Sequence, residues 1–224
     1  MMMNIFNIFD PSTNLFFSLN WMSSLIIFIF YPYQFWLIPS RMNMFFFSIM
    51  NYLYYEFKVL LKYYLSNLFI FLSLFFFILI NNFMGLFPYI FTASSHMSFC
   101  LSLSLTLWLS IMLFGWIQFT NHMFTHLTPS NTPSILMPFM VLIEFISLII
   151  RPITLSIRLT ANMIAGHLLL SLLGSSGQSI SQILIFLFFI FTQILLFILE
   201  ISVSMIQAYV FSILSLLYSS EIYE

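Results

Sequence analysis

Long apolar stretches alternate with short polar segments along the whole sequence. An apolar helix of about 20 residues is long enough to cross the roughly 30 Å hydrocarbon core of a membrane. We therefore predict an all-α polytopic membrane protein that forms a single membrane domain. Its five predicted membrane-crossing helices cover residues 15–38, 66–83, 98–120, 134–174 and 181–218.

Residues 41–64 show a different pattern, with polar side chains on one helical face and apolar side chains on most of the other. The polar positions are Asn51, Tyr55, Lys58 and Lys62, and the apolar ones are Phe46, Ile49, Leu53, Phe57, Leu60 and Leu61. An amphipathic helix of this kind lies in the membrane interface and does not cross the membrane.

The last two apolar segments are longer than a membrane requires. Each has about 40 residues, and at about 1.5 Å per residue each helix would be about 60 Å long, twice the thickness of the core. We predict a pair of long, antiparallel and strongly tilted helices, with Pro138 and Pro152 allowing bends in the first. A plain hairpin centred on Ser176 would place Arg158 opposite Leu195.

The distribution of positive charge predicts the orientation of the chain. Arg41, Lys58 and Lys62 all lie between the first and second predicted spans. Positively charged short loops face the negative side of a membrane, which in a mitochondrion is the matrix. Five crossings then place the N-terminus on the intermembrane side and the C-terminus in the matrix.

Composition supports the membrane assignment and excludes several classes of protein. The chain is 62% hydrophobic and 5% charged, whereas soluble domains carry about 25% charged residues. The net charge of -1 argues against a nucleic-acid partner. A single cysteine, Cys100, excludes an internal disulfide and a multi-cysteine metal site. The 31 Phe and 15 Met residues indicate an AT-rich genome such as that of an organelle, and the N-terminus lacks the pattern of an import signal.

Ionisable and polar side chains form a stripe on each of the two long helices. At 100° per residue, one face of the first helix carries Glu144, Ser147, Arg151, Thr154, Arg158, Asn162 and Ala165. His167 falls on the opposite face, so it can line a path only behind this stripe. On the last helix, Gln193, Glu200 and Gln207 recur every seven residues, with Ser204 beside them. Because a buried charge costs at least about 2.5–3.5 kcal/mol, groups at such stepped depths favour an ion path over a single binding site.

Other functions remain open at this point. His122 and His126 have the i, i+4 spacing of a metal-binding pair, but no third ligand accompanies them, so we predict that both are loop residues like His96 and that no cofactor is held. A haem-bearing redox subunit needs paired histidines within spans, and only His167 is clearly inside one. A subunit of another ion-coupled membrane complex and a stand-alone secondary transporter stay as alternatives, although no internal repeat is visible.

Several motifs in order along the chain resemble one protein family. They are the run from Arg158 to His167, then Glu200, the run from Ile206 to Phe211, the run from Asn81 to Tyr89, and the opening Phe9-Asp10-Pro11. Together they resemble the subunit a family of the mitochondrial F-type ATP synthases, in its animal form. The resemblance covers essentially the whole chain.

The resemblance implies a function and a set of site residues. It implies a stator subunit of the mitochondrial inner membrane, with no enzyme activity of its own, that contacts a ring of c subunits, other stator subunits and lipid. It maps the essential arginine of the family onto Arg158, its polar neighbours onto Asn162 and Gln207, the intermembrane-side half-channel onto His167 and Glu200, and the matrix-side half-channel onto Glu144. Arg151, Gln193 and Ser204 are secondary candidates. A permanently charged guanidinium would lower the pKa of a ring carboxylate and so release its proton. The alternative for Arg158 is a structural ion pair with Glu200.

Overall fold

The computed structural model describes residues 5–13, 17–61, 67–128, 133, 135–177 and 182–223. Lys62, Ser134, Glu224 and the predicted segment boundaries at residues 15, 64, 66 and 181 lie outside these ranges. All regular elements in the described part of the chain are helices. The elements are η1 (Ile5–Phe9), η2 (Leu19–Ile26), α1 (Ile27–Phe30), α2 (Arg41–Leu60), α3 (Leu68–Gly85), η4 (Ala93–Ser95), α4 (Met97–Gln118), α5 (Thr120–Leu127), α6 (Met137–Ser176) and α7 (Ile183–Tyr223).

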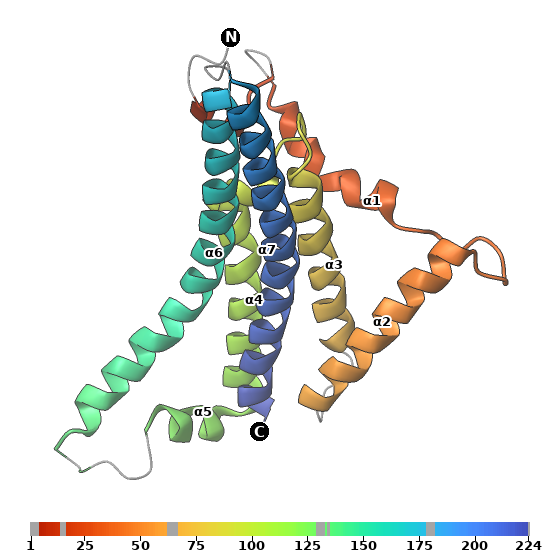
Figure 1. Ribbon diagram of the computed structural model, residues 1–224. Coiled ribbons are helices and arrows are strands. Elements are labelled where there is room, and N and C mark those ends of the chain that lie inside the picture. Colours follow the sequence, from red (N-terminus) through yellow and green to blue (C-terminus); the bar gives the residue numbers. More distant parts are fainter. Residues whose placement is uncertain are drawn as a thin grey trace.

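A bundle of α3, α4, α7 and the second half of α6 forms the centre of the molecule (Figure 1). The helix α7 packs chiefly against α3, and α6 packs chiefly against α4. Among the described helices, these four are long and apolar enough to cross a membrane. The two termini lie at opposite ends of the bundle (Figure 1).

The helix predicted over residues 15–38 is interrupted. The described residues of this segment make the short 3-10 helix η2 and the four-residue helix α1, and irregular chain follows until α2 begins at Arg41. The sequence explains the interruption, because Pro32 lies in this segment, Pro39 follows it directly, and a proline cannot donate a backbone hydrogen bond. The helix α5 is a second departure, because it contains His122 and His126, which were expected to be loop residues.

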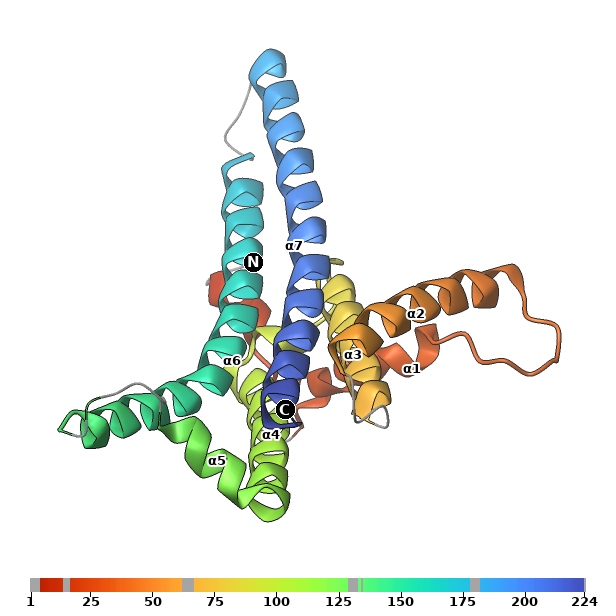
Figure 2. The ribbon, with the colours of Figure 1, turned by 90° about the horizontal axis from the view of Figure 1, so that it is seen from below.

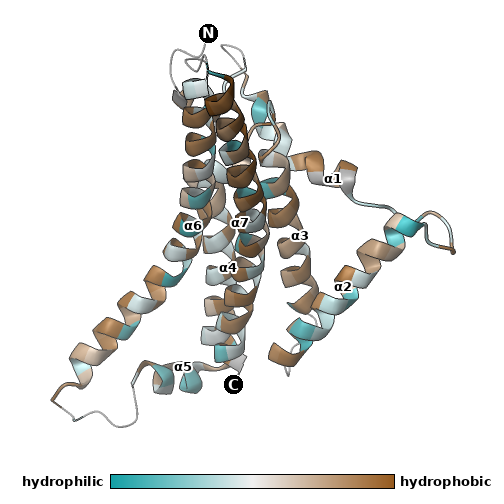
Figure 3. Cartoon of the chain, viewed as in Figure 1, coloured by the Kyte–Doolittle hydropathy of each residue, from teal (hydrophilic) through white to brown (hydrophobic). Residues whose placement is uncertain are grey.

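The core of the bundle is made largely by α3. Its buried side chains, together with buried side chains of α7, are Leu68, Phe71, Leu72, Leu74, Phe75, Phe76, Ile78, Ala208, Phe211 and Leu216. Apolar side chains also cover the outside of the molecule, and α3 and α7 are brown along most of their length in Figure 3. An outer surface of this kind suits lipid or other membrane subunits.

The amphipathic helix α2 begins away from the bundle, and its C-terminal end lies against the bundle near α3 (Figure 1). Ser40 caps its start, since the Ser40 hydroxyl accepts a hydrogen bond from the Asn43 backbone at 3.3 Å. Leu53 and Phe57 are buried, whereas Lys58 on the polar face is exposed. The predicted division into an apolar and a polar face therefore matches how the helix sits against the bundle.

A polar contact also joins α2 to the bundle. The Tyr209 hydroxyl of α7 donates a hydrogen bond to the Glu56 carboxylate of α2 at 3.2 Å. The same carboxylate raises the pKa of Tyr52, because it accepts a hydrogen bond from the neutral Tyr52 hydroxyl and repels its ionised form.

The helix α6 bends along its length. Figures 1 and 2 show its first part leaving the bundle and its second part lying beside α7. Pro152 lies inside the helix and is buried. Because a proline ring removes one helical hydrogen bond and crowds the preceding turn, it accounts for a bend at this point.

We predict that Phe57→Ala detaches α2 from the bundle. Phe57 is fully buried, and removing a buried phenylalanine ring costs about 3 kcal/mol or more. In this variant, hydrogen exchange on the detergent-extracted protein should show that the backbone amides of Arg41–Leu60 lose protection, while those of α3 and α7 keep it. Val59→Ala is the control, because Val59 is 75% exposed. Equal exchange in the two variants would contradict this packing.

Candidate functional site

The polar stripes of α6 and α7 meet at one direct contact. The Asn162 side-chain amide donates a hydrogen bond to Gln207 Oε1 at 3.0 Å. This contact corrects the plain hairpin, because Asn162 and Gln207 are equidistant from a point about eight residues beyond Ser176.

The reason for the offset is visible at the end of α6. A Cβ atom at Gly177 would lie 2.8 Å from the Phe189 ring, so the end of α6 is level with Phe189 and not with the start of α7. The first turns of α7 therefore extend past α6, as Figure 2 shows. As a result, Arg158 lies level with a part of α7 well beyond Leu195.

Arg158 lies one helical turn before Asn162, and its side chain is exposed. Within the described ranges no acidic side chain forms an ion pair with it. The structural ion pair with Glu200 is therefore not formed in this part of the chain. The guanidinium faces outward, away from the packed interior.

Glu200 is buried, with 7% of its surface exposed, and neither carboxylate oxygen has a hydrogen-bond partner among the described residues. It packs against Gly166 of α6, where an added Cβ atom would lie 2.8 Å from Glu200 Oε1. A glycine at this position leaves the room that the carboxylate occupies. Gly166 was not among the predicted site residues, although it lies in the run from Arg158 to His167.

A cavity of about 790 Å³ opens at the end of the bundle that carries the N-terminus. Its walls come from the N-terminal segment, the end of α3 and the loop after it, α6 and α7. Its polar lining residues are Asn7, Asp10, Asn20, His167, Ser171 and Gln193. Phe197 also lines it, one helical turn before Glu200. The lining on α7 thus ends one helical turn before Glu200, which does not itself line the cavity.

His167 faces this cavity, on the other side of α6 from Arg158. Phe9 packs against the His167 ring edge-on, with 6.4 Å between ring centroids. At the mouth, the Ser12 backbone amide and hydroxyl donate to Asp10 Oδ1 at 3.0 and 2.8 Å, which lowers the pKa of Asp10 below its ordinary value. A carboxylate kept ionised in this way makes the mouth negative. His167 therefore lines a cavity behind the face of α6 that carries Arg158.

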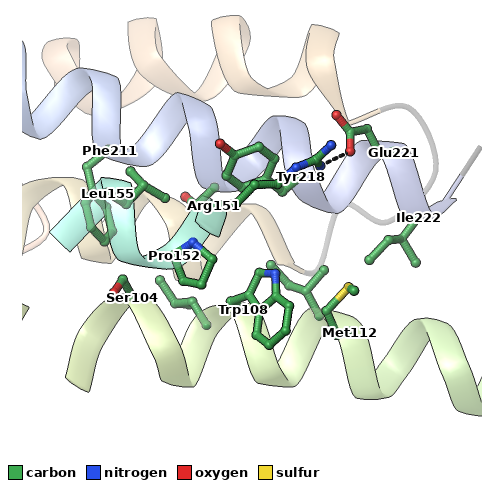
Figure 4. A pocket seen from close by; sticks show the side chains of 13 residues that line it. Ser104, Trp108, Met112, Arg151, Pro152, Leu155, Phe211, Tyr218, Glu221 and Ile222 are labelled. Carbon is green, nitrogen blue, oxygen red and sulfur yellow. Dashed lines mark hydrogen bonds and ion pairs between the residues drawn. The ribbon is translucent and has the colours of Figure 1, made fainter. Parts of the chain in front are cut away.

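Arg151 has a different environment from Arg158 (Figure 4). Its guanidinium forms an ion pair with Glu221 of α7 and lies over the Tyr218 ring, with 4.9 Å between Cζ and the ring centroid. A small cavity of about 40 Å³ adjoins this pair and is also lined by Pro152. The sequence could have pointed to Glu221, because this residue continues the seven-residue spacing of Gln193, Glu200 and Gln207.

The remaining predicted residues lie apart from these contacts. Glu144 is half-buried in the part of α6 that leaves the bundle, and its backbone carbonyl accepts a hydrogen bond from Ser147 at 2.7 Å. Ser204 is buried, and its hydroxyl donates to the Ile201 carbonyl at 2.7 Å. His122 and His126 have ring centroids 6.4 Å apart, and in the described ranges no group of three or more potential metal ligands is found.

Comparison with known proteins identifies the family. A family model described as "ATP synthase A chain" matches residues 15–220. The chain belongs to this family. ATP synthase subunit a of Drosophila melanogaster is 58% identical over 224 residues, which is 99% of this chain and 100% of the relative. ATP synthase subunit a of Locusta migratoria is 58% identical over 226 residues, with both chains fully covered.

A more distant relative agrees. ATP synthase subunit a of Anopheles gambiae is 52% identical over 225 residues, covering 99% of this chain and 100% of the relative. The resemblance to subunit a of the mitochondrial F-type ATP synthase is therefore confirmed. The ATP synthase A chain family supplies a membrane-sector subunit that serves ATP synthesis and proton transport and assembles with other ATP synthase subunits. The chain is accordingly a multi-pass protein of the mitochondrial inner membrane.

We predict that Gly166→Ala moves the Glu200 carboxylate without preventing assembly of the ATP synthase. The new methyl group would overlap the end of a flexible side chain, which can rotate away. A density map of the variant complex should show the carboxylate displaced from α6. Gly174→Ala is the control, since a Cβ atom there meets nothing within 4 Å. A carboxylate left in place between helices that have moved apart would contradict this account of the contact.

Proposed function

We propose that this chain is the proton-carrying stator subunit of the ATP synthase membrane sector. It faces a ring of c subunits, each with one membrane-buried carboxylate, and provides two aqueous half-channels. The observation that carries the proposal is Glu200, a buried carboxylate one helical turn below a polar cavity, on the same helix pair as the exposed Arg158. The chain catalyses no reaction alone and couples proton flow to rotation within the complex.

The placement of the chain in the membrane belongs to this proposal. Arg41 and Lys58 are positively charged, and positively charged short loops face the negative side of a membrane. The side on which these two residues lie therefore faces the matrix. The N-terminus and the cavity then lie on the intermembrane side and the C-terminus on the matrix side. The segment from η2 to the residues before α2 makes the fifth crossing, and α2 lies in the interface on the matrix side. Because α6 and α7 are about 60 Å long, they lie strongly tilted across the roughly 30 Å core.

The cavity serves as the inlet half-channel. Its negative mouth at Asp10 raises the local concentration of cations, including protons. Protons then pass His167 and Gln193 and reach Glu200, whose oxygens have no partner among the described residues and can exchange protons with water. From Glu200 the proton moves to a ring carboxylate.

Arg158 separates the inlet from the outlet. A guanidinium stays charged at any accessible pH, and opposite a ring carboxylate it stabilises the ionised form. A loaded carboxylate that reaches Arg158 therefore loses its proton on the outlet side. The same fixed charge repels protons that would cross directly between the half-channels. The hydrogen bond between Asn162 and Gln207 holds α6 and α7 together beside it.

Glu144 takes up protons on the outlet side. It lies near the start of α6, at the end of the molecule opposite to the cavity, where α6 leaves the bundle. Its carboxylate forms no hydrogen bond or ion pair with other described residues. A half-buried carboxylate in that position can pass protons from the ring to the matrix.

We predict that Arg158→Ala abolishes proton-driven ATP synthesis while the complex still assembles, because the side chain is exposed and supports no packing. Inner-membrane vesicles carrying the variant should show normal amounts of complex and no coupled synthesis. Ile157→Ala is the control, since Ile157 is the adjacent residue and is 47% exposed. Coupled synthesis retained by Arg158→Ala would overturn the role proposed for this arginine.

We predict that Glu200→Gln slows proton flow without a complete block, by roughly 10²-fold if Glu200 acts as a proton carrier. Passive proton conduction through vesicles stripped of the catalytic head measures this directly. Ser202→Ala is the control, because Ser202 is exposed on the same helix and its hydroxyl donates a hydrogen bond to the Leu199 carbonyl of that helix. Unchanged conduction in Glu200→Gln would reduce Glu200 to a structural residue.

A further inference from the structure

The helix α7 is held by hydrogen bonds on two sides at nearly the same level. On one side, Gln207 Oε1 accepts a hydrogen bond from the Asn162 amide of α6 at 3.0 Å. Two residues further on, the Tyr209 hydroxyl donates to the Glu56 carboxylate of α2 at 3.2 Å. At 100° per residue, Gln207 and Tyr209 point about 160° apart around the helix. The helices α2, α7 and α6 are therefore joined in one line across the molecule.

The Glu56 carboxylate is held in place on its own helix. It is half-buried, and it also accepts a hydrogen bond from Tyr52, one turn earlier on α2. Among the described residues it forms no ion pair, so these hydroxyl groups are what compensates it. Leu53 and Phe57 are buried and fix α2 against the bundle. The acceptor that Tyr209 reaches therefore belongs to a helix with its own packing.

The outer side of α7 has little other support at this level. Its inner side packs against α3, and Ala208 and Phe211 are buried there. On the outer side, Met205 and Ile206 are 48% and 60% exposed. Within the described ranges, Tyr209 is the residue of this outer side that forms a hydrogen bond to another helix. The contact with α2 thus holds a side of α7 that packing leaves open.

The same line crosses the helix pair next to Arg158, which lies one helical turn before Asn162 on α6. In the proposed function, the Arg158 guanidinium attracts each ring carboxylate that passes. Because this attraction acts on both partners, a moving carboxylate also pulls on α6. The bond from Asn162 to Gln207 passes the pull on to α7. Keeping Arg158 in place therefore requires a support outside the pair of α6 and α7.

We propose that Glu56 and Tyr209 are positioning residues, which support α7 from the side of α2 and so keep Arg158 in place while the ring turns under load. This inference rests on the function proposed above. Neither residue lies in the proton path. Because α2 is separate from the pair of α6 and α7, it can resist the pull that the ring exerts on them. The support is needed when the ring turns against the resistance of the catalytic head, and not when the ring turns freely.

Tyr209→Phe tests this inference, because it removes one hydroxyl group and leaves the ring in place. In inner-membrane vesicles, ATP synthesis against a high ratio of ATP to ADP should fall about fivefold, equivalent to the roughly 1 kcal/mol that one hydrogen bond contributes. Passive proton conduction through vesicles stripped of the catalytic head should stay unchanged. Tyr55→Phe is the control, since Tyr55 lies next to Glu56 and is 67% exposed. Unchanged synthesis in Tyr209→Phe, or an equal loss of passive conduction, would overturn the inference.

A matched pair of variants at Glu56 tests the other partner. Glutamine and leucine are similar in size, and only glutamine presents an oxygen that can accept the Tyr209 hydrogen bond. Glu56→Leu should therefore reproduce the loss, and Glu56→Gln should stay close to the unaltered level. Adding Tyr209→Phe to Glu56→Leu should cause no further loss, because both changes remove the same bond. Equal losses in the two Glu56 variants, or losses that multiply in the double variant, would contradict the inference.

Arg158→Ala, measured in parallel, separates this inference from the function on which it rests. If Arg158→Ala abolishes coupled synthesis and Tyr209→Phe has no effect, only the supporting role of α2 fails. If Arg158→Ala retains coupled synthesis, the proposed function fails and the inference fails with it.

Discussion

Hydrocarbon offers no hydrogen bonds. Each charged or polar side chain in the membrane-spanning part of this chain must therefore be compensated by an interaction with the protein, with water or with a partner subunit. Arg151 is compensated within the chain by Glu221 and the Tyr218 ring. Asn162 is compensated by Gln207. Glu200 is different, because its buried oxygens have no partner among the described residues and lie one turn below a polar cavity. In the function proposed above, this difference separates groups that hold the helices together from groups that are available to move protons.

The arrangement of α6 and α7 makes this separation possible. Gly166 lets α7 bring a carboxylate against the backbone of α6, and Pro152 lies where α6 turns away from the bundle. The N-terminal segment returns to the same end of the bundle, and Phe9 packs on His167. The cavity is therefore built from parts of the chain that are far apart in sequence, and its wall on α6 lies behind the face that carries Arg158.

The sequence predicted the long apolar helices well, because helix length and hydropathy are local properties. It also placed the polar stripes, since the 3.6-residue period holds through both long helices. Over residues 15–38 the hydropathy predicted a span, whereas the described residues form only short helical pieces that end before Pro32. The register of α6 against α7 could not be predicted, because it depends on tertiary contacts such as Phe189 against the end of α6. The position of Asp10 in the lining of the cavity was missed for the same reason.

The central claim is that the outward face of α6 around Arg158 meets the proton-carrying ring, while His167 and Glu200 lie behind it on the inlet side. A density map of the assembled ATP synthase tests this most directly. The account predicts that the Arg158 guanidinium faces the ring carboxylates and that the cavity opens on the intermembrane side. An Arg158 that faces lipid, or that forms an ion pair with Glu200 in the assembled complex, would contradict it.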